Sequence, residues 1–235
     1  MMLASLRAQV LEANLELVRR GLVVDTFGNA SGIDRKKGLV VIKPSGVPYE
    51  AMKSKDLVVS DLDGRIVEGK LRPSSDLPTH VALYRAFEQI GGVAHTHSRH
   101  ATAWAQAQRE IPCLGTTHAD YFRGAIPITE SLQHKEIASE YERNTGQAIV
   151  KRFYGMDPMS MRAVLVAGHA PFCWGSSAHE AAHLAWMLEE VAQMAFMSLA
   201  INPAARPLAD ELRDKHFLRK HGPEASYGQP RKKKG

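Results

Sequence analysis

The chain has 235 residues and a mass of 25.9 kDa, which suits one domain with a large core. With 44% hydrophobic and 23% charged residues it is typical of globular proteins, and collagen-like, coiled-coil and largely disordered chains are excluded. Four of the five net positive charges lie in Arg231 to Lys234, which leaves the rest near +1 and argues against a nucleic-acid-binding protein.

The first third of the chain predicts one helix followed by short strands. Apolar residues at helical spacing over residues 3–18 predict a helix that ends near Gly21. A second helix over residues 79–87 follows Pro78. Strand-like runs occur at residues 23–26, 33, 39–42, 57–59 and 66–67, with turn-like segments at 34–38 and 61–64.

The remainder alternates strands and helices. Strands are expected at residues 92–96 and 163–166. Helices are expected at residues 99–108, 132–144, 177–200 and 209–220, and Ser177 with Glu180 forms a capping box at the longest of them. Hairpins early in the chain and interleaved helices later predict a single layered α/β domain.

The cellular location is suggested by two absences in the sequence. No apolar run approaches the length of a membrane span, and the start lacks the hydrophobic segment of a signal peptide. Two cysteines, Cys113 and Cys173, are too few for a disulfide framework, so a reducing cytoplasm is expected.

Histidines stand at the ends of two predicted strands. His95 and His97 are two apart, so both imidazoles point to one face of the strand and can reach one ion. His169 follows the strand at 163–166 and would complete a facial trio. Neutral imidazoles suit a borderline metal such as Zn²⁺, whereas a pair of surface histidines is the alternative explanation of the pattern.

Three loops carry small residues, exposed amides and a cation. They are Gly28-Asn29-Ala30-Ser31, Lys43-Pro44-Ser45-Gly46 and Pro73-Ser74-Ser75-Asp76, the last of which is also available to cap a helix. Hydroxyls and free amides beside a helix N-terminus hold anions, so the three loops together favour a phosphate ligand. None of them matches a nucleotide-binding fingerprint.

The segment His179-Glu180-Ala181-Ala182-His183 matches the zinc-protease pattern, and we reject that interpretation. Both histidines fall opposite the apolar stripe of the helix, and Glu180 is already explained by the capping box. Trp186 and Met197 also lie off this stripe, which suggests a second apolar surface and an oligomer contact.

Taken together, these motifs resemble the class II aldolase/adducin family. The segments that carry the resemblance are residues 28–31, 43–46, 73–80, 95–102, 115–122, 168–172 and 220–229. The resemblance implies a three-layer αβα fold with a central, mainly antiparallel sheet over residues 1–229, and leaves 230–235 as a basic C-terminal tail. It also implies a homotetramer with active sites between neighbouring chains.

The resemblance assigns a role to each matching position. Asp76, His95, His97 and His169 are expected to bind the metal, usually Zn²⁺, with Mn²⁺ and Co²⁺ as alternatives. Asp120 and Tyr227 are expected to transfer protons, with Tyr227 supplied by the neighbouring chain. The residues expected to hold the substrate and its phosphate are Gly28, Asn29, Lys43, Ser45, Gly46, Ser74, Ser75 and Thr116, with His216 and Arg219 reaching across the interface.

The activity implied is the interconversion of L-ribulose 5-phosphate and D-xylulose 5-phosphate. The C4 hydrogen is not acidic because C3 is not a carbonyl, so the family breaks and re-forms the C3–C4 bond with a divalent ion as Lewis acid. A family aldolase, which releases the two fragments, and a non-catalytic adducin-like binding domain are the alternatives. Asp76, where the aldolases carry a glutamate base, favours the epimerase. The resemblance does not separate L-arabinose breakdown from L-ascorbate or L-xylulose use.

Overall fold

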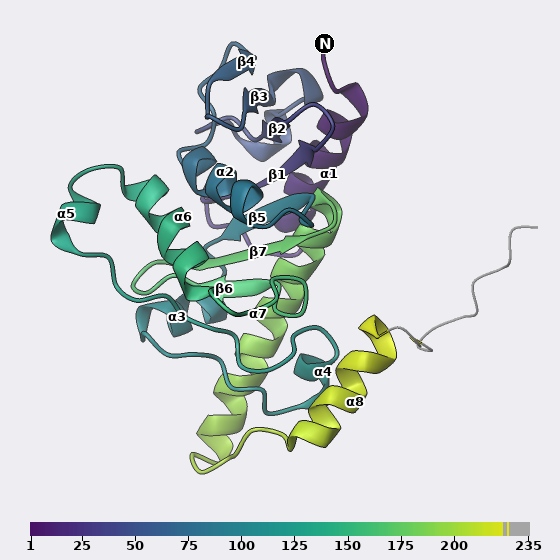
Figure 1. Cartoon of the computed structure of the whole chain (residues 1–235), viewed down its shortest axis with the longest axis vertical. Helices are drawn as coiled ribbons and strands as arrows, with labels where there is room; N and C mark the ends of the chain where they lie inside the picture. The colour runs from purple at the N-terminus through teal and green to yellow at the C-terminus, as the bar shows by residue number, and fades with distance from the viewer. Residues whose placement is uncertain (223–224, 226–235) are drawn as a thin grey trace, which may run out of the picture.

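A computed structural model describes residues 1–222 and residue 225, and its centre is one antiparallel sheet (Figure 1). Every neighbouring pair of strands in the order β4-β3-β2-β1-β5-β7-β6 is antiparallel. The strands are β1 (Gly28–Asp34), β2 (Leu39–Ile42), β3 (Val58–Asp61), β4 (Ile66–Glu68), β5 (Gly92–Thr96), β6 (Ala163–Leu165) and β7 (Pro171–Gly175).

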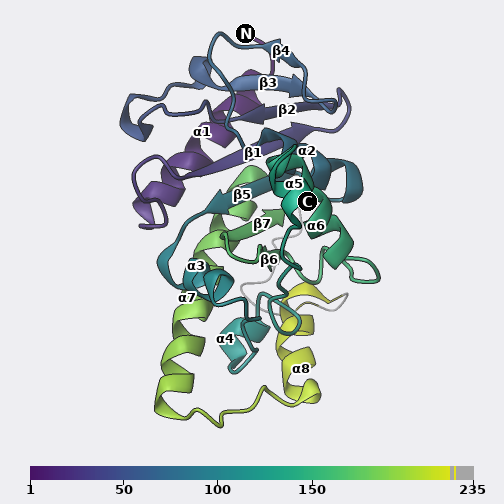
Figure 2. The ribbon, with the colours of Figure 1, turned by 90° about the vertical axis from the view of Figure 1, so that its left-hand side faces the viewer.

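Helices cover both faces of this sheet, which confirms the expected three-layer αβα fold (Figures 1 and 2). Successive residues of β1 point to opposite faces of the sheet and so meet different layers. Ser31 contacts α2 on one face, and Gly32 lies against α1 on the other. The helices are α1 (Ala4–Arg19), α2 (Leu77–Ala86), α3 (Arg99–Gln106), α4 (Thr116–Ala119), α5 (His134–Ile137), α6 (Tyr141–Arg152), α7 (Ala178–Ile201) and α8 (Asp210–His221).

Three expectations about secondary structure were wrong. Residues 23–26 form a turn closed by a bridge between Val24 and Phe27, and the strand starts at Gly28, where pairing with β5 begins. The segment 28–31, expected as a loop, is therefore part of β1. Strand β7 was not predicted, although it pairs with both β5 and β6. In all these places pairing across the sheet overrides local sequence preference.

The helix expected over residues 132–144 is also wrong. Short α5 begins with a capping box formed by Gln133 and Glu136, and α6 starts only at Tyr141. Helix α6 then runs on to Arg152 because it packs along α2, where a Cβ at Gly146 would lie only 2.7 Å from the Ala82 side chain. The local sequence around residues 132–144 carries no signal of this contact between α6 and α2.

Helix α7 packs against β1, β5 and β7 of the sheet and against α1. It is 24 residues long with a mean hydropathy of 1.3 over its most apolar window, so by length and composition it could cross a membrane, contrary to the expectation that no segment does. Its apolar stripe is instead buried against the sheet, as in a core helix of a globular protein. Trp186, expected on a second apolar surface, is half-buried, with the Arg20 guanidinium 4.0 Å from its ring centre.

A row of three glycines lets helices approach the sheet closely, α7 at Gly92 and Gly175 and α1 at Gly32. Gly32, Gly92 and Gly175 stand side by side on β1, β5 and β7. A Cβ on Gly92 would come within 2.3 Å of the backbone at Ala178, which no side-chain rotation can relieve. The missing side chains therefore fix the distance between α7 and β5.

Replacing Gly92 by alanine is expected to lower the free energy of unfolding by about 3 kcal/mol, because backbone must shift to admit the methyl group. Gly115→Ala is the matched control, since a Cβ there meets no atom within 4 Å. Its effect should stay below about 1 kcal/mol. Denaturant unfolding of both variants measures the difference, and equal stabilities would show that the glycine row is not a packing constraint.

Candidate active site

Three imidazoles meet at the end of β5. His95 is the penultimate residue of that strand, His97 follows the strand directly, and His169 lies in the turn between β6 and β7. Each offers a ring nitrogen, and these three nitrogens lie within 4.8 Å of one another. The ring centres are 5.0 Å apart in each pair. The structure thus brings together the three histidines that the sequence placed at two strand ends.

Neighbouring groups orient these rings. His95 donates from Nδ1 to the Pro171 carbonyl at 2.9 Å and stacks on Phe172 with ring centres 4.1 Å apart. His169 Nδ1 lies 3.3 Å from the Tyr141 hydroxyl. In both rings the contact leaves Nε2 available for a ligand. Such outer contacts fix the tautomer and direction of metal-binding imidazoles.

Burial keeps two of these imidazoles, His97 and His169, neutral. It lowers the pKa of His97 to about 4, with His95 adding to the effect, and it lowers the pKa of His169 to about 4 with help from both neighbours. Uncharged rings at pH 7 present lone pairs, as metal binding requires. Three nitrogen donors that lie this close together suit Zn²⁺ or a similar ion.

Asp76 lies beside the imidazoles but outside the group that is within 4.8 Å. It occupies the N-cap of α2 without capping the helix, because its Oδ2 accepts a 2.7 Å hydrogen bond from Asn29. Burial would raise the pKa of Asp76, but His95, His80 and the Asn29 hydrogen bond hold it below its usual range. The carboxylate is therefore ionised and adjacent to the three rings.

Strand pairing and two backbone hydrogen bonds bring the three predicted anion-binding loops to the end of the sheet where the histidines lie. In β1, Asn29 stands opposite His95. The Ser74 amide donates to the Lys43 carbonyl at 2.9 Å, and the Ser45 amide donates to the Arg72 carbonyl at the same distance. Gly28, Gly46 and Ser75 belong to the same three segments, and Ser45, Gly46 and Ser75 are exposed.

Lys43 is a buried cation without an anion. Only 2% of the residue is exposed, and its Nζ donates to the Pro44 carbonyl at 3.2 Å. Its other neighbour is the ring of Tyr49, 4.6 Å from Nζ. Among residues 1–222 no carboxylate pairs with it, and burial lowers its pKa. A ligand with negative charge would supply the missing partner.

Asp120 follows the last residue of α4 and belongs to a second group of side chains. Helix α4 lies beside α8 (Figures 1 and 2). Arg219 donates to both carboxylate oxygens of Asp120 at 2.9 to 3.2 Å, and His216 Nδ1 lies 3.1 Å from Oδ1. Burial would raise the pKa of Asp120, but these two partners keep it low. His216 and Arg219 thus contact Asp120 of their own chain. Thr116 begins α4, and Tyr227 lies outside the described residues.

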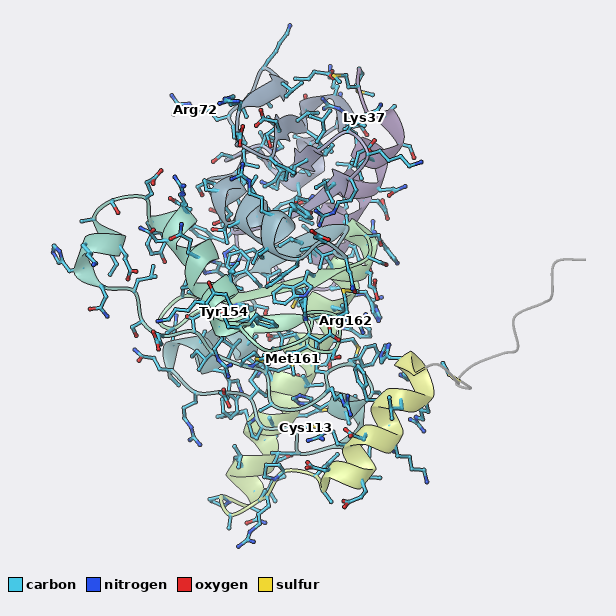
Figure 3. The ribbon with its side chains drawn as sticks, in the orientation of Figure 1. Lys37, Arg72, Cys113, Tyr154, Met161 and Arg162 are labelled. Carbon is cyan, nitrogen blue, oxygen red and sulfur yellow. The ribbon has the colours of Figure 1, made fainter. Side chains whose placement is uncertain are left out.

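Glu180 in the zinc-protease pattern is engaged elsewhere, although only half of the expected capping box forms, because its carboxylate accepts from the Ser176 amide and not from that of Ser177. Its amide donates to the Ser177 hydroxyl at 3.2 Å, and its carboxylate pairs with Arg162, which is labelled in Figure 3. His179 is exposed and His183 contacts the ring of Tyr121. These residues form no metal group of the kind found at His95.

Three neighbours of the site were not identified from the sequence. Tyr49 contacts Lys43, Tyr141 contacts His169, and buried His80 hydrogen bonds Ser31 at 2.7 Å while its Nε2 meets no partner in the described part of the chain. The spacing of these residues carries no signal of a site. Only their contacts in the folded chain place them there.

Comparison with known proteins agrees with this geometry. Residues 8–196 match the model of the Class II Aldolase and Adducin N-terminal domain. The chain is 56% identical over 224 residues to "L-ribulose-5-phosphate 4-epimerase UlaF" of Salmonella paratyphi B and to the protein of that name from Salmonella typhi. In each case the match covers 95% of this chain and 98% of the relative.

Solved structures of aldolases share the fold. An "L-fuculose 1-phosphate aldolase" superposes with a TM-score of 0.78 at 25% identity, covering 92% of this chain and 95% of its own. The L-fuculose-1-phosphate aldolase of Thermus thermophilus gives a TM-score of 0.67 at 26% identity, covering 87% and 100%. With a family model that spans most of its length, this chain belongs to the class II aldolase and adducin family.

Proposed function

We propose that the protein is a metal-dependent epimerase that interconverts L-ribulose 5-phosphate and D-xylulose 5-phosphate. The observation that carries the proposal is the meeting of three imidazoles with a buried Lys43, with which no carboxylate of the described residues pairs, around one end of the sheet. The first suits a divalent cation and the second a phosphate. The 56% identity to relatives named as this epimerase supports the choice of substrate.

The metal ligands of the proposal are His95, His97 and His169, with Asp76 as the fourth. Zn²⁺ fits the donor set best, because nitrogen donors and one carboxylate are its usual protein ligands. When bound, the cation supplies Lewis-acid stabilisation of negative charge on the substrate oxygens. Asn29, which bonds Asp76, holds that carboxylate in place.

The remaining residues retain the substrate and move its protons. Lys43, with the amides and hydroxyls of the Ser45 and Ser74 segments, would hold the phosphate while C3–C4 cleavage leaves a three-carbon anion and glycolaldehyde phosphate. The aldehyde then turns its other face and the bond re-forms with inverted C4. Asp120 and Tyr227 are the proposed proton carriers on opposite sides of the C4 oxygen.

Two proton carriers on opposite sides of the C4 oxygen favour an oligomer in which each active site is built from two chains. Tyr227 would come from a neighbouring chain of a homotetramer, and the C-terminal helix that holds Asp120 would lie at the same interface. Exposed apolar side chains on the last turns of α7 support such a contact, namely Met194, Phe196, Met197 and Ile201. The cysteines are free and buried, in keeping with the proposed cytoplasmic location.

The deciding experiment is incubation of the Zn²⁺-loaded protein with L-ribulose 5-phosphate. Accumulation of D-xylulose 5-phosphate is the expected result. Free glycolaldehyde phosphate and dihydroxyacetone would identify an aldolase instead. No turnover together with no bound metal would indicate a binding domain. Chromatography of the sugar phosphates and metal analysis of the same sample separate the three outcomes.

Removing one imidazole should remove the metal. His97→Asn is expected to weaken Zn²⁺ binding at least about 100-fold, since loss of an outer partner of a ligand already costs up to that factor. His179→Asn is the control, because this exposed histidine of the zinc-protease pattern should leave zinc content unchanged. Competition with a chromophoric chelator measures both, and equal affinities would contradict the assignment.

Asp120→Asn tests the proposed proton transfer. The amide cannot take up the proton of the C4 hydroxyl, so kcat should fall by about 10²- to 10⁴-fold with zinc content intact. Asp214→Asn is the matched control, since this carboxylate on α8 also pairs with arginines, Arg123 and Arg213. A loss of thermal stability with unchanged kcat would show that Asp120 only anchors α8.

A further inference from the structure

We propose that Tyr49 is a positioning residue that sets the affinity of the site for phosphate, by holding the Lys43 ammonium and the Gly28 carbonyl in register. This inference rests on the proposed function, in which Lys43 binds the phosphate of the substrate. Tyr49 itself is not expected to touch the reacting carbons. It acts through the two groups that its ring and hydroxyl hold.

One side chain joins two of the anion-binding segments. Tyr49 belongs to a 3₁₀ turn, Tyr49–Ala51, just after the Lys43 loop, and it is only 4% exposed. The face of its ring lies 4.6 Å from Lys43 Nζ. Its hydroxyl donates to the Gly28 carbonyl at 2.5 Å. Displacing Tyr49 would therefore disturb both segments at once.

The ring matters because Lys43 has lost water without gaining a carboxylate. A desolvated ammonium is costly, and its one hydrogen-bond acceptor in the described chain is the Pro44 carbonyl. The negative face of an aromatic ring attracts a cation most strongly when both are shielded from water. Tyr49 thus stabilises the charged amine without accepting a hydrogen bond from it, so the N–H groups that do not donate to the Pro44 carbonyl can bind an oxyanion.

The hydroxyl matters because it meets β1 where the strand begins. Gly28 has a φ of +135°, a backbone conformation that side chains rarely adopt, and its carbonyl points to Tyr49. The next residue is Asn29, which holds Asp76. Burial raises the pKa of Tyr49, so the phenol stays protonated and continues to donate. The bond therefore keeps the start of β1 next to Lys43.

The test compares variants that remove the two contacts separately. Tyr49→Phe keeps the ring and loses the hydrogen bond, whereas Tyr49→Leu loses both. Lys43→Met removes the charge. Phe87→Leu removes a ring that packs against Phe153 and Trp174 instead, and it controls for the loss of a buried aromatic side chain. If Tyr49→Leu does not fold, Tyr49→Met fills more of the space and replaces it.

Two experiments are made on the Zn²⁺-loaded proteins: calorimetry gives the Kd of inorganic phosphate, and steady-state kinetics give kcat and KM for L-ribulose 5-phosphate. Tyr49→Leu should raise both Kd and KM about tenfold, a typical cation–π effect, with kcat within about threefold. Tyr49→Phe should raise them about threefold. Phe87→Leu should change neither constant.

A double variant decides whether Tyr49 acts through Lys43. In the Lys43→Met background, Tyr49→Leu should weaken phosphate binding by only about threefold, the share of the lost Gly28 hydrogen bond, because the cation that the ring holds is gone. Equal effects in both backgrounds, an unchanged Kd in Tyr49→Leu, or no phosphate binding by the unaltered protein would overturn the inference. Phosphate binding without turnover of L-ribulose 5-phosphate would contradict the proposed function alone.

Discussion

The position of β5 between β1 and β7 controls the arrangement of the site. Hydrogen bonding across these three strands places His95 opposite Asn29 on one side and Phe172 on the other. The strand can lie under α7 only because Gly92 and Gly175 leave room for the start of that helix. The end of β5 is thereby held rigidly, as a site that must hold ligands at fixed distances requires.

Several buried groups of the site lack a counterion or a hydrogen-bond partner in the described residues. Lys43 is buried without a carboxylate, and Asn29 Oδ1 and His80 Nε2 are buried without partners in the described residues. Neutral imidazoles and an ionised Asp76 stand beside them. Such groups cost stability unless something binds to them, so a cation and an anion at these places would stabilise the protein.

The structure divides the predicted site residues into two groups. The imidazoles, Asp76 and the three loops meet at the end of β5, whereas Asp120 is held by the C-terminal helix through Arg219 and His216. Within one chain, the two groups of residues lie on different helices and strands. Shared sites between chains, as the family resemblance implies, would give the second group a substrate to act on.

The local sequence determined most of the elements and the chemistry of the site. Apolar periodicity predicted α1, α2, α3, α7 and α8, and the polar ends of apolar strands predicted the three histidines. These features depend on neighbours along the chain. The bounds of β1 and α6, the existence of β7, and the roles of Tyr49 and Tyr141 were decided only by tertiary structure. The reason is that each depends on a contact with a distant segment, such as Gly146 on α2 or Tyr49 on Gly28, which no local pattern encodes.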